Sequence, residues 1–86
     1  MKIQGSVVKE QGVTFAIVIV KPHVLQNSVT REQFRTSMKA IFAGMPIILM
    51  AQDVRGMPTY HGRKDIVNFL ASIDPGRIPW KEYTVG

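Results

Sequence analysis

The sequence Val-Thr-Phe-Ala-Ile-Val-Ile-Val occupies residues 13–20. In an extended strand both of its faces are apolar, with Val13, Phe15, Ile17 and Ile19 on one face and Ala16, Val18 and Val20 on the other. A strand with one face in water alternates apolar with polar residues, whereas this pattern is typical of a strand covered on both faces. We therefore expect helices on one side of this strand, and a loop, neighbouring side chains or another subunit on the other side.

The flanking residues predict a partner strand and an end for this central strand. Residues 2–9 have the composition of a second strand, and Glu10-Gln11-Gly12 joins the two, since Gly12 can adopt the positive φ of a tight hairpin turn. Pro22 ends the central strand because proline cannot donate a hydrogen bond to the ladder. The sequence thus predicts that residues 2–9 and 13–20 pair antiparallel.

A first helix is predicted from about residue 31 to residue 43, after a connection at residues 23–29. Thr30 and Gln33 have the spacing of a capping box, and Val29 and Phe34 have the spacing of a hydrophobic staple. Apolar residues recur at helical spacing, namely Phe34, Met38, Ile41 and Phe42. Gly44 and Pro46 then stop the helix.

The second half of the chain predicts two more strands, a second helix and a docked tail. Residues 47–51 are apolar on both faces, residues 53–56 have turn composition, and residues 57–60 form a short strand that Pro58 places at a sheet edge. Helical spacing returns from Arg63 and stops at Asp74-Pro75-Gly76. The tail contains Trp80, the chain's only tryptophan, and we expect it to dock.

Together these elements predict a single α+β domain over residues 1–86 in the order β-β-α-β-β-α. We expect a mixed or antiparallel sheet, packed by two helices, with a C-terminal extension. A chain of 86 residues buries only about 60 to 65% of its unfolded surface, and no cysteine is present to form a disulfide. A hydrophobic content of 45% is high for this size, which favours association into a homo-oligomer.

Charge gives a second indication of partners. Eleven Lys and Arg residues against six Asp and Glu residues give a net charge of +5, which suits an acidic ligand or a nucleic acid. The basic residues are scattered along the chain, as on an ordinary solvated surface. Arg31, Arg35 and Lys39 form one stripe at four-residue spacing; we expect their stems to cover the core while the charges stay in water, with phosphate binding as the alternative.

Most of the versatile polar side chains gather in residues 52–65, between two apolar segments. Free amide groups at the start of the second helix, with basic side chains nearby, can bind phosphate or carboxylate. The sequence therefore predicts an anion-binding site at this place made of Arg55, Tyr60, His61, Arg63 and Lys64. The alternative is that the glycines, Pro58 and Asp65 only build a turn and a helix start.

No catalytic residue is assigned from the sequence. The chain has no cysteine, its serines lack the context of a nucleophile elbow, and His23 and His61 are its only histidines. A small enzyme using His61 with Asp53 or Tyr60 as acid and base is the least favoured interpretation. No metal site or cofactor is predicted, because His61, Asp53 and Asp65 lack a ligand spacing and no nucleotide motif is present.

No apolar run approaches the roughly 20 residues that a membrane span requires, and no targeting segment is visible. We therefore expect no membrane association and a cytoplasmic location. The favoured interpretation is a non-enzymatic, homo-oligomeric binding or interaction domain with an anion-binding loop at the start of the second helix. Nucleic-acid or nucleotide binding is the alternative.

Overall fold

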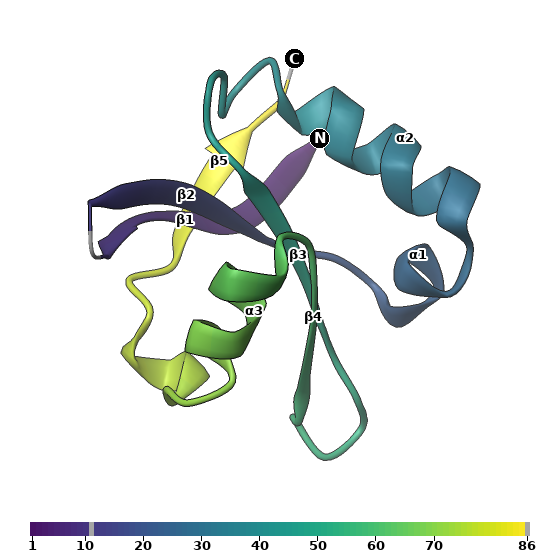
Figure 1. The fold of residues 1–86 in the computed structure, drawn as a ribbon. Helices are drawn as coiled ribbons and strands as arrows, with labels where there is room; N and C mark the ends of the chain where they lie inside the picture. Colours follow the sequence, from purple (N-terminus) through teal and green to yellow (C-terminus); the bar gives the residue numbers. More distant parts are fainter. Residues whose placement is uncertain (11, 86) are drawn as a thin grey trace.

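The computed structural model describes residues 1–10 and 12–85, and its centre is a five-stranded mixed sheet (Figure 1). The strands, in the spatial order β4-β3-β2-β1-β5, are β1 (Lys2–Glu10), β2 (Val13–Ile19), β3 (Ile47–Gln52), β4 (Pro58–His61) and β5 (Lys81–Thr84). β2 and β3 are parallel, and the other neighbouring strands are antiparallel. The predicted antiparallel pairing of β1 with β2 and the edge place of β4 are therefore confirmed. The turn predicted at residues 10–12 includes Gln11, which lies outside the described residues.

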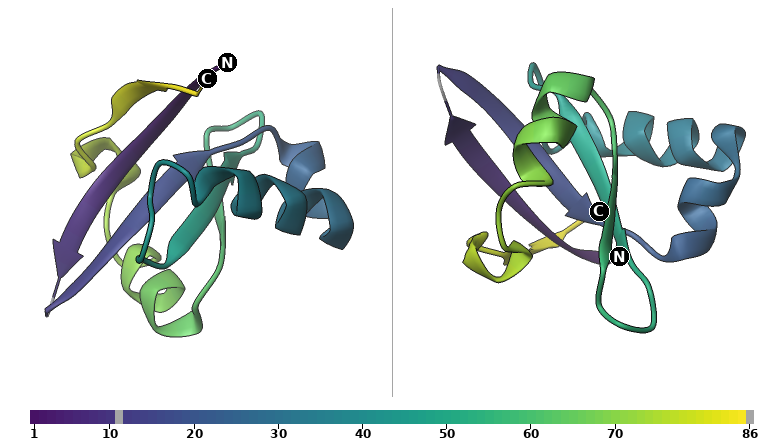
Figure 2. Two further views of the ribbon diagram at one scale, coloured as in Figure 1. Left: turned by 90° about the horizontal axis from the view of Figure 1, so that it is seen from above. Right: turned by 60° about the horizontal axis from the view of Figure 1, so that its bottom comes forward.

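The helical segments are α1 (Pro22–Gln26), α2 (Ser28–Met38), α3 (Lys64–Leu70) and the 3-10 turn η1 (Pro75–Arg77). α1 and α2 connect β2 to β3 and pack on one face of the sheet, and α3 packs on the other face (Figure 2). The predicted α+β class is confirmed. The order of elements differs from the prediction by the helix α1 and the strand β5.

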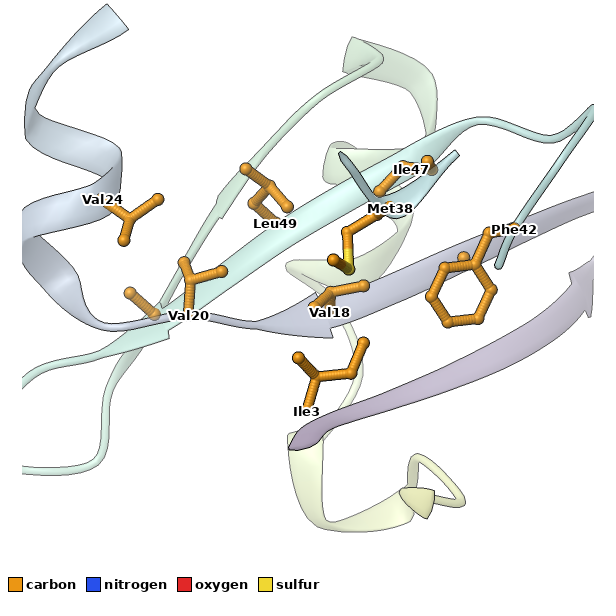
Figure 3. Close-up of a cluster of buried hydrophobic side chains, with 10 residues drawn as sticks. Ile3, Val18, Val20, Val24, Met38, Phe42, Ile47 and Leu49 are labelled. Atoms are coloured by element: carbon orange, nitrogen blue, oxygen red, sulfur yellow. The ribbon is translucent and has the colours of Figure 1, made fainter. Parts of the chain in front are cut away.

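The side chains of β2 are covered on both faces by the same chain. The first core lies between the sheet and the α1–α2 pair, and its buried members are Ile3, Ala16, Val18, Val20, Val24, Met38, Phe42, Ile47, Leu49 and Ala51 (Figure 3). The second core lies on the α3 side, and its buried members are Phe15, Ile17, Ile48, Met50, Ile66, Leu70 and Ile78. A second subunit is therefore not needed to cover this strand, so the two apolar faces of β2 give no support for association.

The first predicted helix begins earlier and ends earlier than expected. Its N-cap is Asn27, whose side-chain oxygen accepts hydrogen bonds from the amides of Val29 at 2.9 Å and Thr30 at 3.2 Å. The capping box predicted at Thr30 was wrong, because asparagine is the stronger N-cap and lies three residues upstream. The helix ends at Met38 rather than residue 43, and the tight turn that follows still buries Phe42, whose amide donates to Met38 O at 2.9 Å.

Two further helix predictions need correction. Residues 22–26, expected as part of an irregular connection, form α1, which starts with Pro22 at the position where proline is favoured in helices. The second predicted helix ends at Leu70, before the expected stop at Asp74. Asp74 instead caps η1 by accepting a hydrogen bond from the amide of Gly76 at 2.9 Å.

The tail docks, as expected, and it does so as the strand β5 beside β1. The rings of Phe42 and Tyr83 meet edge to face with centroids 5.1 Å apart. They pass over Gly5 on β1, where an added Cβ would lie 3.6 Å from each ring and 2.8 Å from the carbonyl oxygen of Ile17. Glycine at this position therefore lets β1 lie close to the Ile17 carbonyl of β2, whereas an added Cβ would make only ordinary contacts with the two rings. Trp80, just before β5, donates from Nε1 to Pro75 O at 3.1 Å.

Candidate functional site

The five residues of the predicted anion site lie in separate surroundings. Arg55 is exposed in the turn between β3 and β4. Tyr60 and His61 are neighbours on β4 and face opposite sides of the sheet, Tyr60 toward the second core and His61 toward α2. Arg63 is held by a bidentate contact with Asp65, and Lys64 is exposed at the start of α3. The structure does not bring the five together, and their binding of an anion stays a prediction.

His61 takes part instead in a contact centred on Arg35 of α2. The Nη2 atom of Arg35 lies 2.8 Å from Nδ1 of His61 and donates to the His61 carbonyl at 3.0 Å. Its Nε donates to Ile47 O at 3.1 Å, and its Nη1 pairs with Glu32. Only 16% of the Arg35 side chain is exposed, so its charge is bound by backbone carbonyls and does not stay in water as the sequence suggested.

The same contact sets the protonation state of His61. An arginine guanidinium can only donate, so Nδ1 must accept, and the proton of the neutral ring is on Nε2. Burial, together with the positive charges of Arg31 and Arg35, holds the pKa of His61 below its usual range, against the opposing charge of Glu32. The contact thus joins a charged arginine on α2 to a neutral histidine on β4.

This link predicts a loss of stability in mild acid. As the pH falls below about 6.5, the usual pKa of histidine, the unfolded chain takes up a proton at His61 while the folded chain does not. The unfolded state then binds more protons, so the free energy of unfolding decreases toward the lowered folded pKa. Urea unfolding at pH 7.5 and pH 5 measures this decrease.

Two control variants distinguish the contributions of His61 and His23 to the pH dependence of stability. His61→Asn keeps an acceptor near the position of Nδ1 and has no titrating ring, so the difference between the two pH values should shrink. His23→Asn removes the other imidazole and should leave the difference in place. An unchanged difference in His61→Asn would show that His61 is not its source.

The turn between β3 and β4 displays apolar side chains on a fixed backbone. Oδ1 of Asp53 accepts hydrogen bonds from the amides of Arg55 at 2.8 Å and Met57 at 2.9 Å, and the Gln52 side chain donates to Gly56 O at 3.2 Å. Val54 is fully exposed and Met57 is 62% exposed. We call residues 53–57 the hairpin tip. Val54 and Met57, two apolar residues in a turn, were the sequence signal for this surface, and the sequence analysis missed it.

A hollow of about 490 Å³ lies beside the hairpin tip, between β4, the end of α3 and η1. Met57, Leu70 and Ile73 contribute to its walls, and Asp74 is the one charged residue among the described residues that line it. Tyr60 also lines the hollow, but its hydroxyl is buried away from solvent and has no hydrogen-bond partner within residues 1–10 and 12–85. Burial, and to a lesser degree the charge of Asp74, raises the pKa of Tyr60, so the phenol keeps its proton. We call this space the tyrosine hollow.

The basic residues divide among many elements. Arg31 and Arg35 pair with Glu32, Arg63 pairs with Asp65, and Lys2 lies 3.6 Å from Glu82. The other basic residues belong to different strands, helices and turns: Lys9, Lys21, Lys39, Arg55, Lys64, Arg77 and Lys81. This distribution favours no single nucleic-acid surface, and nucleic-acid binding stays a prediction.

Within the part of the chain that the structure describes, no three His, Asp or Glu side chains group as metal ligands. None of the helices in that part is both long and apolar enough to cross a bilayer. The hairpin tip and the tyrosine hollow remain as features that the packing of one chain does not explain, because turns are usually polar and buried hydroxyls are usually paired. In comparison with known proteins, the chain matches no family model, no curated protein and no solved structure.

Proposed function

We propose that this protein is a small, non-enzymatic interaction domain that forms a homodimer, in which the hairpin tip of each copy enters the tyrosine hollow of the other. One observation carries the proposal. A hydrogen-bonded turn holds the fully exposed Val54 beside a hollow whose walls include the apolar side chains of Met57, Leu70 and Ile73. A contacting surface would remove the exposed side chains of Val54 and Met57 from water.

The shape of this surface suits a second copy of the same chain. In a twofold dimer one patch must be complementary to itself, because each contact occurs twice. Here an apolar projection, the hairpin tip, and a hollow of about 490 Å³ lie side by side and share Met57. In two copies related by a twofold axis, the hairpin tip of each copy can therefore enter the tyrosine hollow of the other. The turn is already held by Asp53, so little conformational freedom is lost on binding.

Charge is complementary in the same arrangement. Arg55 lies on the hairpin tip, and Asp74 lines the tyrosine hollow. Neither takes part in a salt bridge within the described residues. In the exchanged dimer, Arg55 of each copy faces Asp74 of the other. The anion that Arg55 recognises is then a carboxylate of the second copy, and the exposed side chains of Val54 and Met57 are covered at the same contact.

Pairing through the sheet edges is a poorer route to a dimer. The two edge strands, β4 and β5, have four residues each. Pro58 removes one donor from β4, and β5 begins with the charged pair Lys81 and Glu82. Short edge strands with proline or charged residues resist the addition of another strand. The hairpin tip therefore offers the better contact.

Charge reversal tests the proposed pairing. Arg55→Asp and Asp74→Arg each place like charges opposite one another in a homodimer, and we expect each variant alone to dimerise at least about tenfold more weakly. Mixed in equal amounts, the two variants restore both opposite-charge pairs in a heterodimer. Sedimentation equilibrium of each variant and of the mixture measures this. Recovery only in the mixture supports the contact, and no recovery contradicts it.

Two exposed valines provide a matched control. Val54→Asp places a charge on the hairpin tip and is expected to give a monomer, whereas Val29→Asp makes the same change on α2, where Val29 is 63% exposed, and should leave the dimer intact. Thermal unfolding of both variants checks that each is folded. A wild-type protein that stays monomeric at concentrations of about 100 µM overturns the proposal, since its binding free energy would then be below about 5.5 kcal/mol.

A further inference from the structure

We infer that a second hollow, at the open end of the first core, binds an amphipathic organic anion consisting of one carboxylate head and an aliphatic chain. This hollow has a volume of about 560 Å³ and lies between the start of β1, the end of β2 and the helices α1 and α2. Its volume falls within the range of small-molecule sites in proteins. We call it the first-core hollow. It shares no lining residue with the tyrosine hollow, so it stands apart from the proposed dimer.

The walls of the first-core hollow are apolar. Ile3, Val20 and Val24 are buried members of the first core, and Phe34 packs against that core from α2. Figure 3 shows Ile3, Val20 and Val24 among the side chains gathered on this side of the sheet. Ile3 lies on β1, Val20 directly follows β2 and Val24 lies on α1, and the packed core fixes the relative positions of these three parts. An aliphatic chain entering here would extend the apolar packing that the core already has.

The rim of the first-core hollow is basic. Lys21 follows β2 and His23 lies in the first turn of α1, and both are exposed at the hollow. Lys2 contributes a third basic group, although Glu82 lies 3.6 Å from it. No Asp or Glu is found among the described residues that line this hollow. A carboxylate head can therefore meet the ammonium group of Lys21 and an imidazole N–H of His23, and no carboxylate among the described lining residues opposes it.

The basic rim and the apolar walls of the first-core hollow together define the class of ligand that can bind there. A small inorganic anion would leave the apolar walls of Val20, Val24 and Phe34 in contact with water, and an aliphatic cation would be repelled by Lys21 and Lys2. A monocarboxylate with a chain of several carbons satisfies both parts of the hollow. Octanoate, hexanoate and acetate form a series that varies the chain with a constant head, and octylammonium varies the head with a constant chain.

Titration of isotope-labelled protein by NMR tests the inference. Octanoate should shift the amides of Val20, Lys21 and Val24 in a saturable way and bind about tenfold more tightly than hexanoate, because each buried CH₂ contributes about 0.8 kcal/mol. Acetate and octylammonium should give no saturable shift at these amides. Equal affinity for octanoate and octylammonium, or affinity that does not depend on chain length, would overturn the inference.

A pair of lysine variants locates the head group. Lys21→Gln should weaken octanoate binding by about fivefold, as expected for one exposed ion pair. Lys64→Gln removes an equally exposed lysine at the start of α3, away from this hollow, and should bind octanoate as tightly as the wild type. Equal loss in both variants would show only general charge attraction and contradict a site at Lys21.

Discussion

Arg35→Met is expected to lower the free energy of unfolding by about 3 kcal/mol, because it leaves several partly buried acceptors without their donor. The guanidinium donates to the carbonyl oxygens of Ile47 and His61 and contacts the ring of His61, and methionine can replace the apolar stem but none of these hydrogen bonds. A buried polar atom that loses its partner costs about 1 to 3 kcal/mol. Urea unfolding followed by the fluorescence of Trp80 measures the change.

Arg63→Met is the matched control for that experiment. Arg63, like Arg35, is held by several contacts: it makes a bidentate contact with the carboxylate of Asp65. Both of these side chains are at least half exposed. Exposed ion pairs contribute little because water already solvates both groups, so the urea midpoint should change little. The assignment of Arg35 as the link between α2 and β4 is wrong if the two variants unfold at the same urea concentration.

Phe42→Ala is expected to destabilise the protein by about 3 to 5 kcal/mol, the usual range for deleting a buried phenylalanine ring. Phe42 is 2% exposed and joins three parts of the fold: the turn after α2, Gly5 on β1, and Tyr83 on β5. A loss of this size approaches the whole stability of a small domain. Circular dichroism during thermal unfolding measures it, and hydrogen exchange should show faster exchange of the β5 amides than of β2.

Milder variants keep this prediction testable if Phe42→Ala does not fold. Phe42→Leu retains much of the volume and should lose less stability, yet it removes the edge-to-face contact with Tyr83 and should still speed exchange in β5. Tyr83→Phe keeps the ring and should leave that exchange unchanged. Slow exchange of β5 in Phe42→Leu would show that the ring does not hold the tail.

The parts of the fold that were predictable have strong local patterns. The two apolar faces of residues 13–20 indicated a strand with cover on both sides, and Pro58 indicated an edge strand. α1 was missed because five residues are too few for helical periodicity to appear. The helix start was misplaced because two capping patterns overlap within residues 27–33, and the stronger one at Asn27 prevails.

The candidate site was less predictable because its contacts are not local. Arg35 and His61 are 26 residues apart, and nothing near either residue in the sequence indicates their hydrogen bond. Tyr60 and His61 were expected to act together, but neighbouring residues of a strand point to opposite faces, so the sheet separates them. Asp74 was read only as a helix stop, and its place beside Tyr60 depends on how η1 packs.

The pairing of β5 with β1 has a consequence for how the chain folds. Lys2 faces Thr84 across this pair, so the contact closes a loop that contains nearly the whole chain. Contacts between residues so distant in sequence carry a large entropic cost and tend to form late. Until β5 arrives, the outer edge of β1 is open, as in any nascent sheet that still lacks its last strand. We therefore expect the docking of β5 to be a late step of folding and to cover the open edge of β1.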